Sequence, residues 1–200
     1  MIAPEKKSSL RIYNKDASCV FFKTKEQWGE FSNMSHDFPY LLGGAHILTN
    51  EHLYQALKFQ SFPYLQKDIL SAKTAKEAKS IARLNVEKIQ DDKKESIKYM
   101  RYVLFCKYKA YTAFFDDLFL KSDNNPIVEM SYKDEFWGAI PDDNKLIGIN
   151  ALGRLWMEVR ENRTNINNLV KSNLFSLCSE KISYESEVVV QDRSNQIRLL

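Results

Sequence analysis

The sequence predicts an α+β fold that is predominantly α-helical and carries a small β-sheet. Short apolar segments bounded by polar residues, glycine or proline come first, and they have the length of strands. From residue 51 to about residue 115, apolar residues recur instead at the spacing of amphipathic helices. With 200 residues, of which 44% are hydrophobic, the chain is long enough for one packed domain and too short for two substantial ones.

Two strand regions are expected in the first fifty residues, after a polar lead-in over residues 1–17. The apolar run of residues 19–22 reads as a buried strand. A hairpin should follow, because residues 39–42 and 45–48 flank Gly43-Gly44, a pair that tolerates the positive φ angles of a tight two-residue turn.

Helical signals dominate the middle of the chain. Thr49 or Asn50 can cap a helix that begins around residue 51, because either side chain can accept a hydrogen bond from a free backbone N–H group. A capping-box pattern at residues 74 and 77 predicts a helix to about residue 83. A longer amphipathic helix is expected from Asp91-Asp92 to Phe115 or beyond, and the polar residues 122–126 end it.

The last third of the chain mixes both kinds of element. Residues 127–130 read as a short strand, residues 131–138 as a polar and aromatic turn, and residues 139–146 as a loop. Asn150 is the expected cap of a helix over residues 151–160. Its inner stripe should consist of Leu152, Leu155, Trp156 and Val159. A weaker helix is expected near residues 169–178, and residues 187–190 read as a strand or a tail.

Composition points to a soluble cytoplasmic protein without a membrane partner. No apolar run approaches the ~20 residues that cross a bilayer, and the first seven residues contain no apolar signal segment. The three cysteines, Cys19, Cys106 and Cys178, are widely separated and lie among apolar or aromatic neighbours, so they read as reduced core residues. The three histidines lack the paired spacing of a metal motif, and no metal site is expected.

Charge is unevenly distributed although the net charge is only +3. Residues 73–109 contain eleven Lys or Arg against five Asp or Glu, whereas residues 116–143 contain two against eight. The basic segment could attract phosphates or nucleic acid through long-range electrostatics. The alternative is a solvated helix face with interspersed charge pairs.

The segment around Glu51 has the strongest pattern for a site. Its polar residues share one helical face, and its apolar residues occupy the other. The polar face holds Glu51, Tyr54, Gln55 and Lys58, and the apolar side holds Leu53, Ala56 and Leu57. Glu51 falls in the first turn, where the positive end of the helix dipole favours a carboxylate. Lys58 lies ~10 Å further along the axis, so a small polar molecule could fit between the two. The alternative is a glutamate that only complements the dipole, with a solvated Lys58.

Three other segments hold polar or aromatic groups that a core does not require: residues 29–34, 134–138 and 148–154. Each also has an ordinary interpretation, as a turn, a core aromatic and a close-packed helix start. Free N–H groups at the last of these, together with Arg154, could hold a phosphate. The sequence contains neither a Walker-type lysine nor a Rossmann Gly-x-Gly-x-x-Gly motif.

Taken in order, these four segments resemble the NADAR superfamily, which is named for a predicted link to NAD and ADP-ribose chemistry and includes riboflavin-pathway N-glycosidases. The resemblance covers residues 18–162, between the lead-in at 1–17 and a C-terminal extension at 163–200. It rests on Phe31-Ser32-Asn33, Glu51 to Phe59, Val128-Glu129 with Asp134 to Gly138, and Gly148 to Arg160. Residues 28–34 and Trp137-Gly138-Ala139 resemble the members encoded beside DNA ADP-ribosyltransferase toxins.

This resemblance implies hydrolysis of an N-glycosidic bond between a phosphorylated ribose and an amino-bearing base. Glu51 would stabilise the positive charge that develops on the sugar and draw a proton from the attacking water. Asp134 would be the second carboxylate, and Trp137 a flat wall against base or sugar. Lys58 has two open roles, which are to bind a phosphate or hydroxyl, or to act as a Schiff-base amine. The residues expected to bind substrate are Phe31, Asn33, Tyr54, Gln55, Trp137, Gly138, Gly148, Asn150 and Arg154.

The expected function is an ADP-ribosyl glycohydrolase that removes ADP-ribose from guanine bases, in DNA, and so acts as an antitoxin. Its partner would be an ADP-ribosyltransferase toxin encoded in the same operon, and no cofactor is expected. One alternative is a riboflavin-pathway N-glycosidase that acts on phosphorylated aminopyrimidines. Another is a non-catalytic ADP-ribose-binding module.

Overall fold

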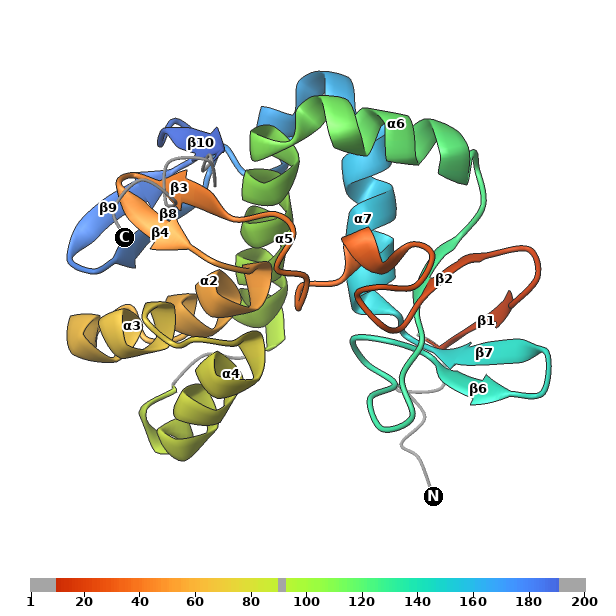
Figure 1. Cartoon of the computed structure of the whole chain (residues 1–200), viewed down its shortest axis with the longest axis horizontal. Helices are drawn as coiled ribbons and strands as arrows, with labels where there is room; N and C mark the ends of the chain where they lie inside the picture. The colour runs from red at the N-terminus through yellow and green to blue at the C-terminus, as the bar shows by residue number, and fades with distance from the viewer. Residues whose placement is uncertain (1–9, 90–92, 191–200) are drawn as a thin grey trace, which may run out of the picture. The chain divides into compact units, whose positions relative to one another are not determined.

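The computed structural model describes residues 10–89 and 93–190 (Figure 1). The α-helices are α2 (Asn50–Leu57), α3 (Pro63–Leu70), α4 (Ala75–Leu84), α5 (Lys93–Ala110), α6 (Thr112–Ser122) and α7 (Ala151–Asn162). The strands are β1 (Arg11–Asn14), β2 (Cys19–Phe21), β3 (Tyr40–Leu42), β4 (Ala45–Ile47), β5 (Ile127–Glu129), β6 (Ile140–Asp142), β7 (Lys145–Gly148), β8 (Leu174–Leu177), β9 (Glu180–Ser183) and β10 (Val188–Val190). Short 3-10 helices cover Gly29–Phe31 (η1), Val86–Lys88 (η2) and Arg163–Leu169 (η3). The predicted class, α+β with a predominance of helix, is confirmed.

The chain forms two compact units. Unit 1 combines the described residues up to Ser35 with Ala113–Ile166, and unit 2 combines His36–Thr112 with the described residues from Asn167 onward.

Within residues 10–89 and 93–190, no helix has the length and apolarity to cross a membrane. The three cysteines carry free thiols, and burial raises the pKa of Cys106 to about 12.

Unit 1 contains two small sheets and α7, which contacts β5. Strands β1, β7 and β6 form an antiparallel sheet, and β2 pairs in parallel with β5. The core is aromatic: Trp156 on α7 stacks on Phe115 at a ring distance of 5.0 Å and lies 5.3 Å from Phe31. The Trp156 indole also donates a 2.8 Å hydrogen bond to the Phe31 carbonyl oxygen, which satisfies its buried N–H group. The predicted inner stripe of this helix is buried, as expected.

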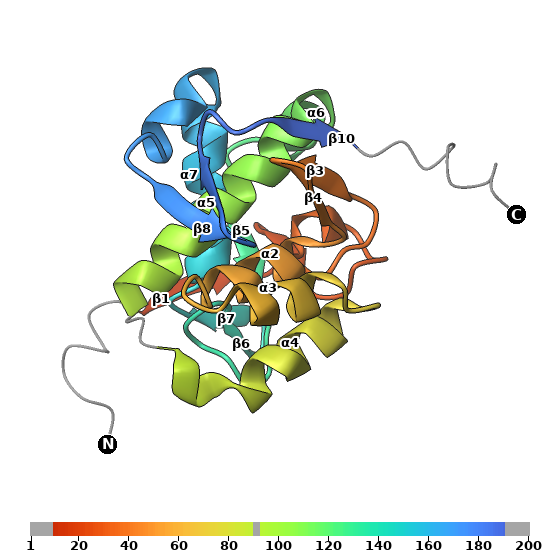
Figure 2. The same ribbon diagram turned by 90° about the vertical axis from the view of Figure 1, so that its left-hand side faces the viewer.

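Unit 2 surrounds the short helix α2. Figure 2 shows α2 together with α3 and α4, and α2 also contacts α5. The predicted hairpin is confirmed as β3 and β4, whose connecting residues Gly43 and Gly44 both have positive φ. On the other edge of β3, strand β10 adds a third strand. The β8–β9 hairpin packs Phe175 edge-on against Tyr99 and Tyr102 of α5.

Two predictions about strands are corrected by the structure. The expected polar lead-in contains β1, which pairs with β7 so that Tyr13 lies opposite Leu146. Its strand pattern is weak because only Tyr13 is buried within β1. The expected loop at 139–146 is the β6–β7 hairpin, whose polar residues 142–145 are exposed and therefore resemble a loop.

Two predictions about helices are also corrected. The single long helix is divided at Tyr111 into α5 and α6. At this break the Thr112 hydroxyl donates to the Tyr108 carbonyl oxygen (3.0 Å), a contact of the kind that bends helices. Its expected start at Asp91-Asp92 lies outside the described residues. The weak helix at 169–178 is replaced by β8, which pairs with β9 in a hairpin. Its two turn residues, Cys178 and Ser179, have positive φ although neither is glycine, so the sequence carries no turn signal there. Of the two alternatives for residues 187–190, the strand is found, as β10.

Candidate active site

Helix α2 carries the predicted carboxylate at its first turn. Thr49 is its N-cap, with extended backbone and a side chain that accepts a hydrogen bond from the His52 N–H group. Glu51 follows in the first turn and is only 6% exposed. Because every residue of this helix is buried, the polar row does not face open solvent as a surface helix would.

Gln55 connects the two charged residues of the row. Its amide nitrogen donates to Glu51 Oε1 at 2.7 Å, and its amide oxygen accepts from Lys58 Nζ at 2.9 Å. Lys58 Nζ also lies 4.2 Å from the ring centroid of Tyr54. The structure therefore brings Glu51, Tyr54, Gln55 and Lys58 together in one hydrogen-bonded and cation–π row, as the helical spacing predicted.

The amide fixes one carboxylate oxygen and leaves the other available. Across the described residues, Glu51 Oε2 accepts no hydrogen bond from another side chain, whereas Oε1 is held by Gln55. Gln55 is 4% exposed and is held in turn by Lys58. A carboxylate fixed in this way has the geometry to accept a proton from water or to face a developing positive charge.

Lys79 is a residue of this site that sequence analysis missed. Its ammonium nitrogen lies 3.9 Å from Glu51 Oε1, while its side chain is 54% exposed. Helix α4 brings it there, because α4 contacts α2. The capping box correctly predicted α4, and Thr74 accepts from the Glu77 N–H group at 3.1 Å. Nothing local, however, indicates which helix α4 packs against.

His52 anchors α2 from behind the polar row. Its Nε2 lies 3.0 Å from the Ala72 carbonyl oxygen, and its Nδ1 lies 2.8 Å from the Thr49 hydroxyl. A carbonyl oxygen only accepts, so Nε2 carries the proton and Nδ1 accepts from Thr49. Burial lowers the pKa of His52, which keeps the ring neutral in this arrangement.

In unit 1, Asp134 organises the turn that leads to Trp137. Its Oδ1 accepts from the backbone N–H groups of Phe136 and Trp137, both at 2.9 Å, and its own N–H group donates to Ser131 Oγ. Asp134 is exposed, and Trp137 is half-buried. The carboxylate therefore has a structural task in this turn, and its predicted part in the chemistry stays a prediction.

Two of the predicted glycines allow close packing behind this turn. A Cβ atom at Gly138 would lie 2.7 Å from the Glu129 carbonyl oxygen, and one at Gly148 would overlap the Gly138 carbonyl oxygen. Asn150, expected as a side-chain cap, occupies the N-cap position of α7 with φ 52° but makes no capping hydrogen bond. Its amide instead pairs with one edge of β5, donating to Ile127 O (2.9 Å) and accepting from the Glu129 N–H group (3.1 Å). The expected capping role is wrong because α7 contacts β5, and the sequence around Asn150 does not indicate this contact.

The remaining predicted residues differ in accessibility. Arg154 is exposed on α7, where its guanidinium can reach an anion. Asn33 is buried, with 5% exposure. Phe31 is fully buried within the aromatic core of unit 1, so packing accounts for its presence.

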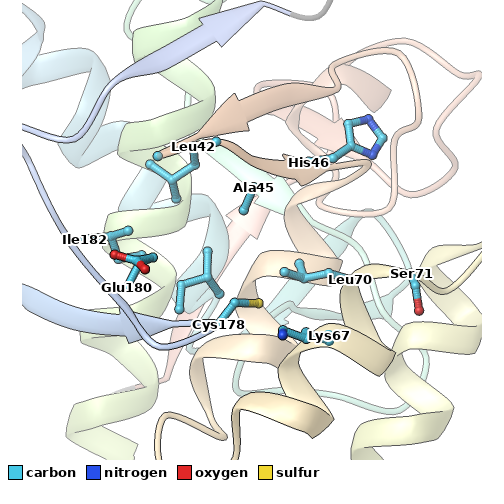
Figure 3. Close-up of a pocket in the computed structure, with 12 residues that line it drawn as sticks. Leu42, Ala45, His46, Lys67, Leu70, Ser71, Cys178, Glu180 and Ile182 are labelled. Carbon is cyan, nitrogen blue, oxygen red and sulfur yellow. The ribbon is translucent and has the colours of Figure 1, made fainter.

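Two pockets lie away from the predicted residues. One in unit 2, of about 480 Å³, is formed by the β3–β4 hairpin, α3 and the β8–β9 hairpin, with Ala45, Leu70 and Cys178 on its walls (Figure 3). The other, in unit 1, has a volume of about 270 Å³ and includes Arg160, which already donates to the Asp123 and Asn125 carbonyl oxygens. Among the described residues, no group of three or more His, Cys, Asp or Glu side chains could hold a metal ion.

The fold and the α2 row together define a small α+β protein with a buried, amide-held carboxylate as its candidate catalytic group. The chain belongs to the NADAR domain family, whose model matches residues 20–163. This match confirms the family predicted from the four sequence segments.

Two relatives agree with this assignment. The chain is 33% identical over 158 residues to a protein named N-glycosidase Npun_R5314 from Nostoc punctiforme, and the match covers 73% of this chain and 92% of the relative. It also resembles the solved structure of the E. coli protein YbiA, with a TM-score of 0.61 and 27% identity over 72% of this chain and 83% of YbiA.

Proposed function

We propose that this protein is an N-glycosidase that removes ADP-ribose from ADP-ribosylated guanine bases in DNA, with Glu51 as the catalytic carboxylate. The observation that carries the proposal is the buried Glu51 held by Gln55 through one oxygen only. Similarity to a protein named N-glycosidase supports glycosidase activity in general. The choice of guanine rests on the sequence resemblance to members encoded beside DNA ADP-ribosyltransferase toxins.

The proposed reaction breaks the bond between ribose C1 and the base nitrogen. Positive charge builds on C1 and the ring oxygen as this bond lengthens, and the Glu51 carboxylate stabilises that charge. Water adds its oxygen to C1 and keeps one proton there as the new hydroxyl, while Oε2 accepts the other. The leaving base nitrogen takes up that second proton, which restores the Glu51 carboxylate. The low exposure of Glu51 strengthens its interaction with the charged sugar, because less water screens it.

Of the two roles of Lys58, the geometry favours binding. Its nitrogen donates to Gln55 and lies over the Tyr54 ring, and an ammonium is the form that a ring face attracts. Schiff-base chemistry would require the neutral amine. Borohydride treatment during turnover should therefore leave Lys58 unmodified, whereas a trapped adduct on Lys58 would establish the covalent route.

The direct test measures release of ADP-ribose from a short DNA strand containing ADP-ribosylated guanine. Glu51→Gln should lower the rate at least about 100-fold, the loss typical of removing one preorganised electrostatic group. Glu87→Gln, which neutralises an exposed glutamate of unit 2, should retain wild-type activity. Equal activity of Glu51→Gln and wild type would remove Glu51 from the mechanism.

Two other outcomes point to the alternatives. Turnover of phosphorylated aminopyrimidines alone, unaffected by added salt, would assign the protein to the riboflavin pathway, because a small substrate releases few counterions. Stable binding of ADP-ribose without turnover of any linkage, unchanged by Glu51→Gln, would indicate a binding module. The antitoxin role predicts in addition that expression of the wild type, and not of Glu51→Gln, protects cells from a guanine-modifying ADP-ribosyltransferase.

A further inference from the structure

Helix α4 presents a row of exposed cations beside the helix that carries Glu51. It buries Ala75, Ala78 and Ala82, so its contact with the rest of unit 2 uses a stripe of small residues. The neighbouring stripe holds Lys76, Lys79 and Arg83, all of them exposed. We call these three residues the α4 basic face. Lys79, at its centre, lies 3.9 Å from Glu51 Oε1.

The two outer cations of the α4 basic face form no ion pair within residues 10–89 and 93–190. Across the part of the chain that the structure describes, neither Lys76 nor Arg83 has an ion-pair partner. The only acidic residue of α4 is Glu77, and its carboxylate accepts from the Lys73 backbone N–H group at 2.8 Å. A face that is merely solvated usually interleaves its cations with acids, as Lys88 with Glu87 does in η2. The α4 basic face lacks that arrangement.

The spacing of the face matches an extended polyanion. Lys76 and Arg83 are separated by ~10 Å along the helix axis, at ~1.5 Å per residue. Duplex DNA carries one phosphate per strand for every ~3.4 Å of helix axis, and a single strand can extend further per nucleotide, so the row is as long as about two to three consecutive phosphates. Lys79 then lies where the chain of phosphates passes closest to the candidate carboxylate. A mononucleotide carries its charge on one phosphate, whereas a polynucleotide presents a phosphate at each step along the row.

We propose that the α4 basic face binds the phosphodiester backbone of a polynucleotide and delivers a base to the Glu51 site. The inference rests on the proposed function for the reaction that follows, but binding itself requires no turnover. A base from which attached ADP-ribose is removed must leave the stack or lie in a single strand to reach the site. We therefore expect single-stranded substrate to bind through this face.

The test measures binding of an unmodified, fluorescent single-stranded oligonucleotide by anisotropy at several salt concentrations. The double variant Lys76→Gln/Arg83→Gln should bind at least about tenfold more weakly than wild type at low salt. The slope of log affinity against log salt should become shallower by ~1.4, since each contact with a single strand contributes ~0.7. The matched control Lys145→Gln/Lys171→Gln removes two other exposed lysines and should bind like wild type.

The outcomes separate this inference from the proposed function. Wild-type affinity in the double variant, or an equal loss in the control, would overturn the inference whatever the enzyme hydrolyses. Binding that weakens only in the α4 variant would support it, even if no ADP-ribosylated substrate is cleaved. Where cleavage occurs, the double variant should also lower the ratio of kcat/KM for the modified oligonucleotide to kcat/KM for the modified nucleoside. An unchanged ratio would contradict a role of this face in substrate delivery.

Discussion

Gln66 offers a quantitative test of how the C-terminal segment holds α2 in place. It is fully buried on α3, and its amide nitrogen donates to Ala56 O at 3.1 Å and to Ser176 O at 2.8 Å. Its amide oxygen accepts from the Cys178 N–H group at 2.7 Å. One side chain therefore joins three elements of unit 2: α2, α3 and the β8–β9 hairpin.

The substitution Gln66→Leu retains a similar volume and removes all three hydrogen bonds. Ala56 O still accepts from the Phe59 N–H group, so the loss falls on Ser176 and Cys178. A buried polar group left unsatisfied costs about 1–3 kcal/mol, so two such groups give a loss of ~2–6 kcal/mol. Greater apolar burial by leucine returns roughly 1 kcal/mol, and the net destabilisation should be ~1–5 kcal/mol.

Urea unfolding of Gln66→Leu against wild type measures this loss directly. Gln27→Leu, at an exposed glutamine, is the control and should change the free energy of unfolding by less than about 0.5 kcal/mol. A loss below about 1 kcal/mol for Gln66→Leu would refute the reasoning, because it would mean that the buried amide does not join α2 to the β8–β9 hairpin.

Three further predictions concern single residues. Gly153→Ala should lower the free energy of unfolding in urea by ~1–3 kcal/mol, because the added Cβ would overlap Ile127 O. This overpacking exceeds the ~1 kcal/mol that alanine gains over glycine in helix propensity. A stabilised variant would contradict the close packing of α7. Gln55→Met should lower kcat/KM by ~10–100-fold, because Glu51 loses the donor that fixes its Oε1. A wild-type rate would show that this hydrogen bond does not contribute to catalysis. His52, whose pKa burial lowers, stabilises the fold above pH ~6.5, and this contribution is lost as pH falls through the lowered pKa, because the unfolded chain binds the proton first. Unfolding free energies measured between pH 7.5 and 5 should therefore fall less for His52→Asn than for wild type, and parallel curves would count against this account.

Local signals predicted the elements that carry the site. The Gly43-Gly44 turn, the Thr49 cap and the Thr74 capping box each depend on a few neighbouring residues, and all three are present. The polar row of α2 follows from helical periodicity alone, so its members were found together.

The features that sequence analysis missed depend on contacts between distant segments. Lys79 reaches Glu51 only because α4 packs against α2. Asn150 was expected to cap α7, yet its amide satisfies β5, which lies more than twenty residues earlier. The weak β1 segment becomes a strand because β7 supplies its hydrogen-bond partners. No window of neighbouring residues contains these partners.

The strands outside the family match have a practical consequence for anyone who divides the chain into fragments. A fragment of residues 20–163 would contain every predicted site residue but would lack β1, β8, β9 and β10. It would expose the rings of Tyr99 and Tyr102 that Phe175 covers, and it would leave β3 with an unpaired edge. Exposed aromatic surface and a bare strand edge both favour aggregation. The segment that matches the family therefore contains the predicted site residues, but it is shorter than the segment needed to keep the protein from aggregating in solution.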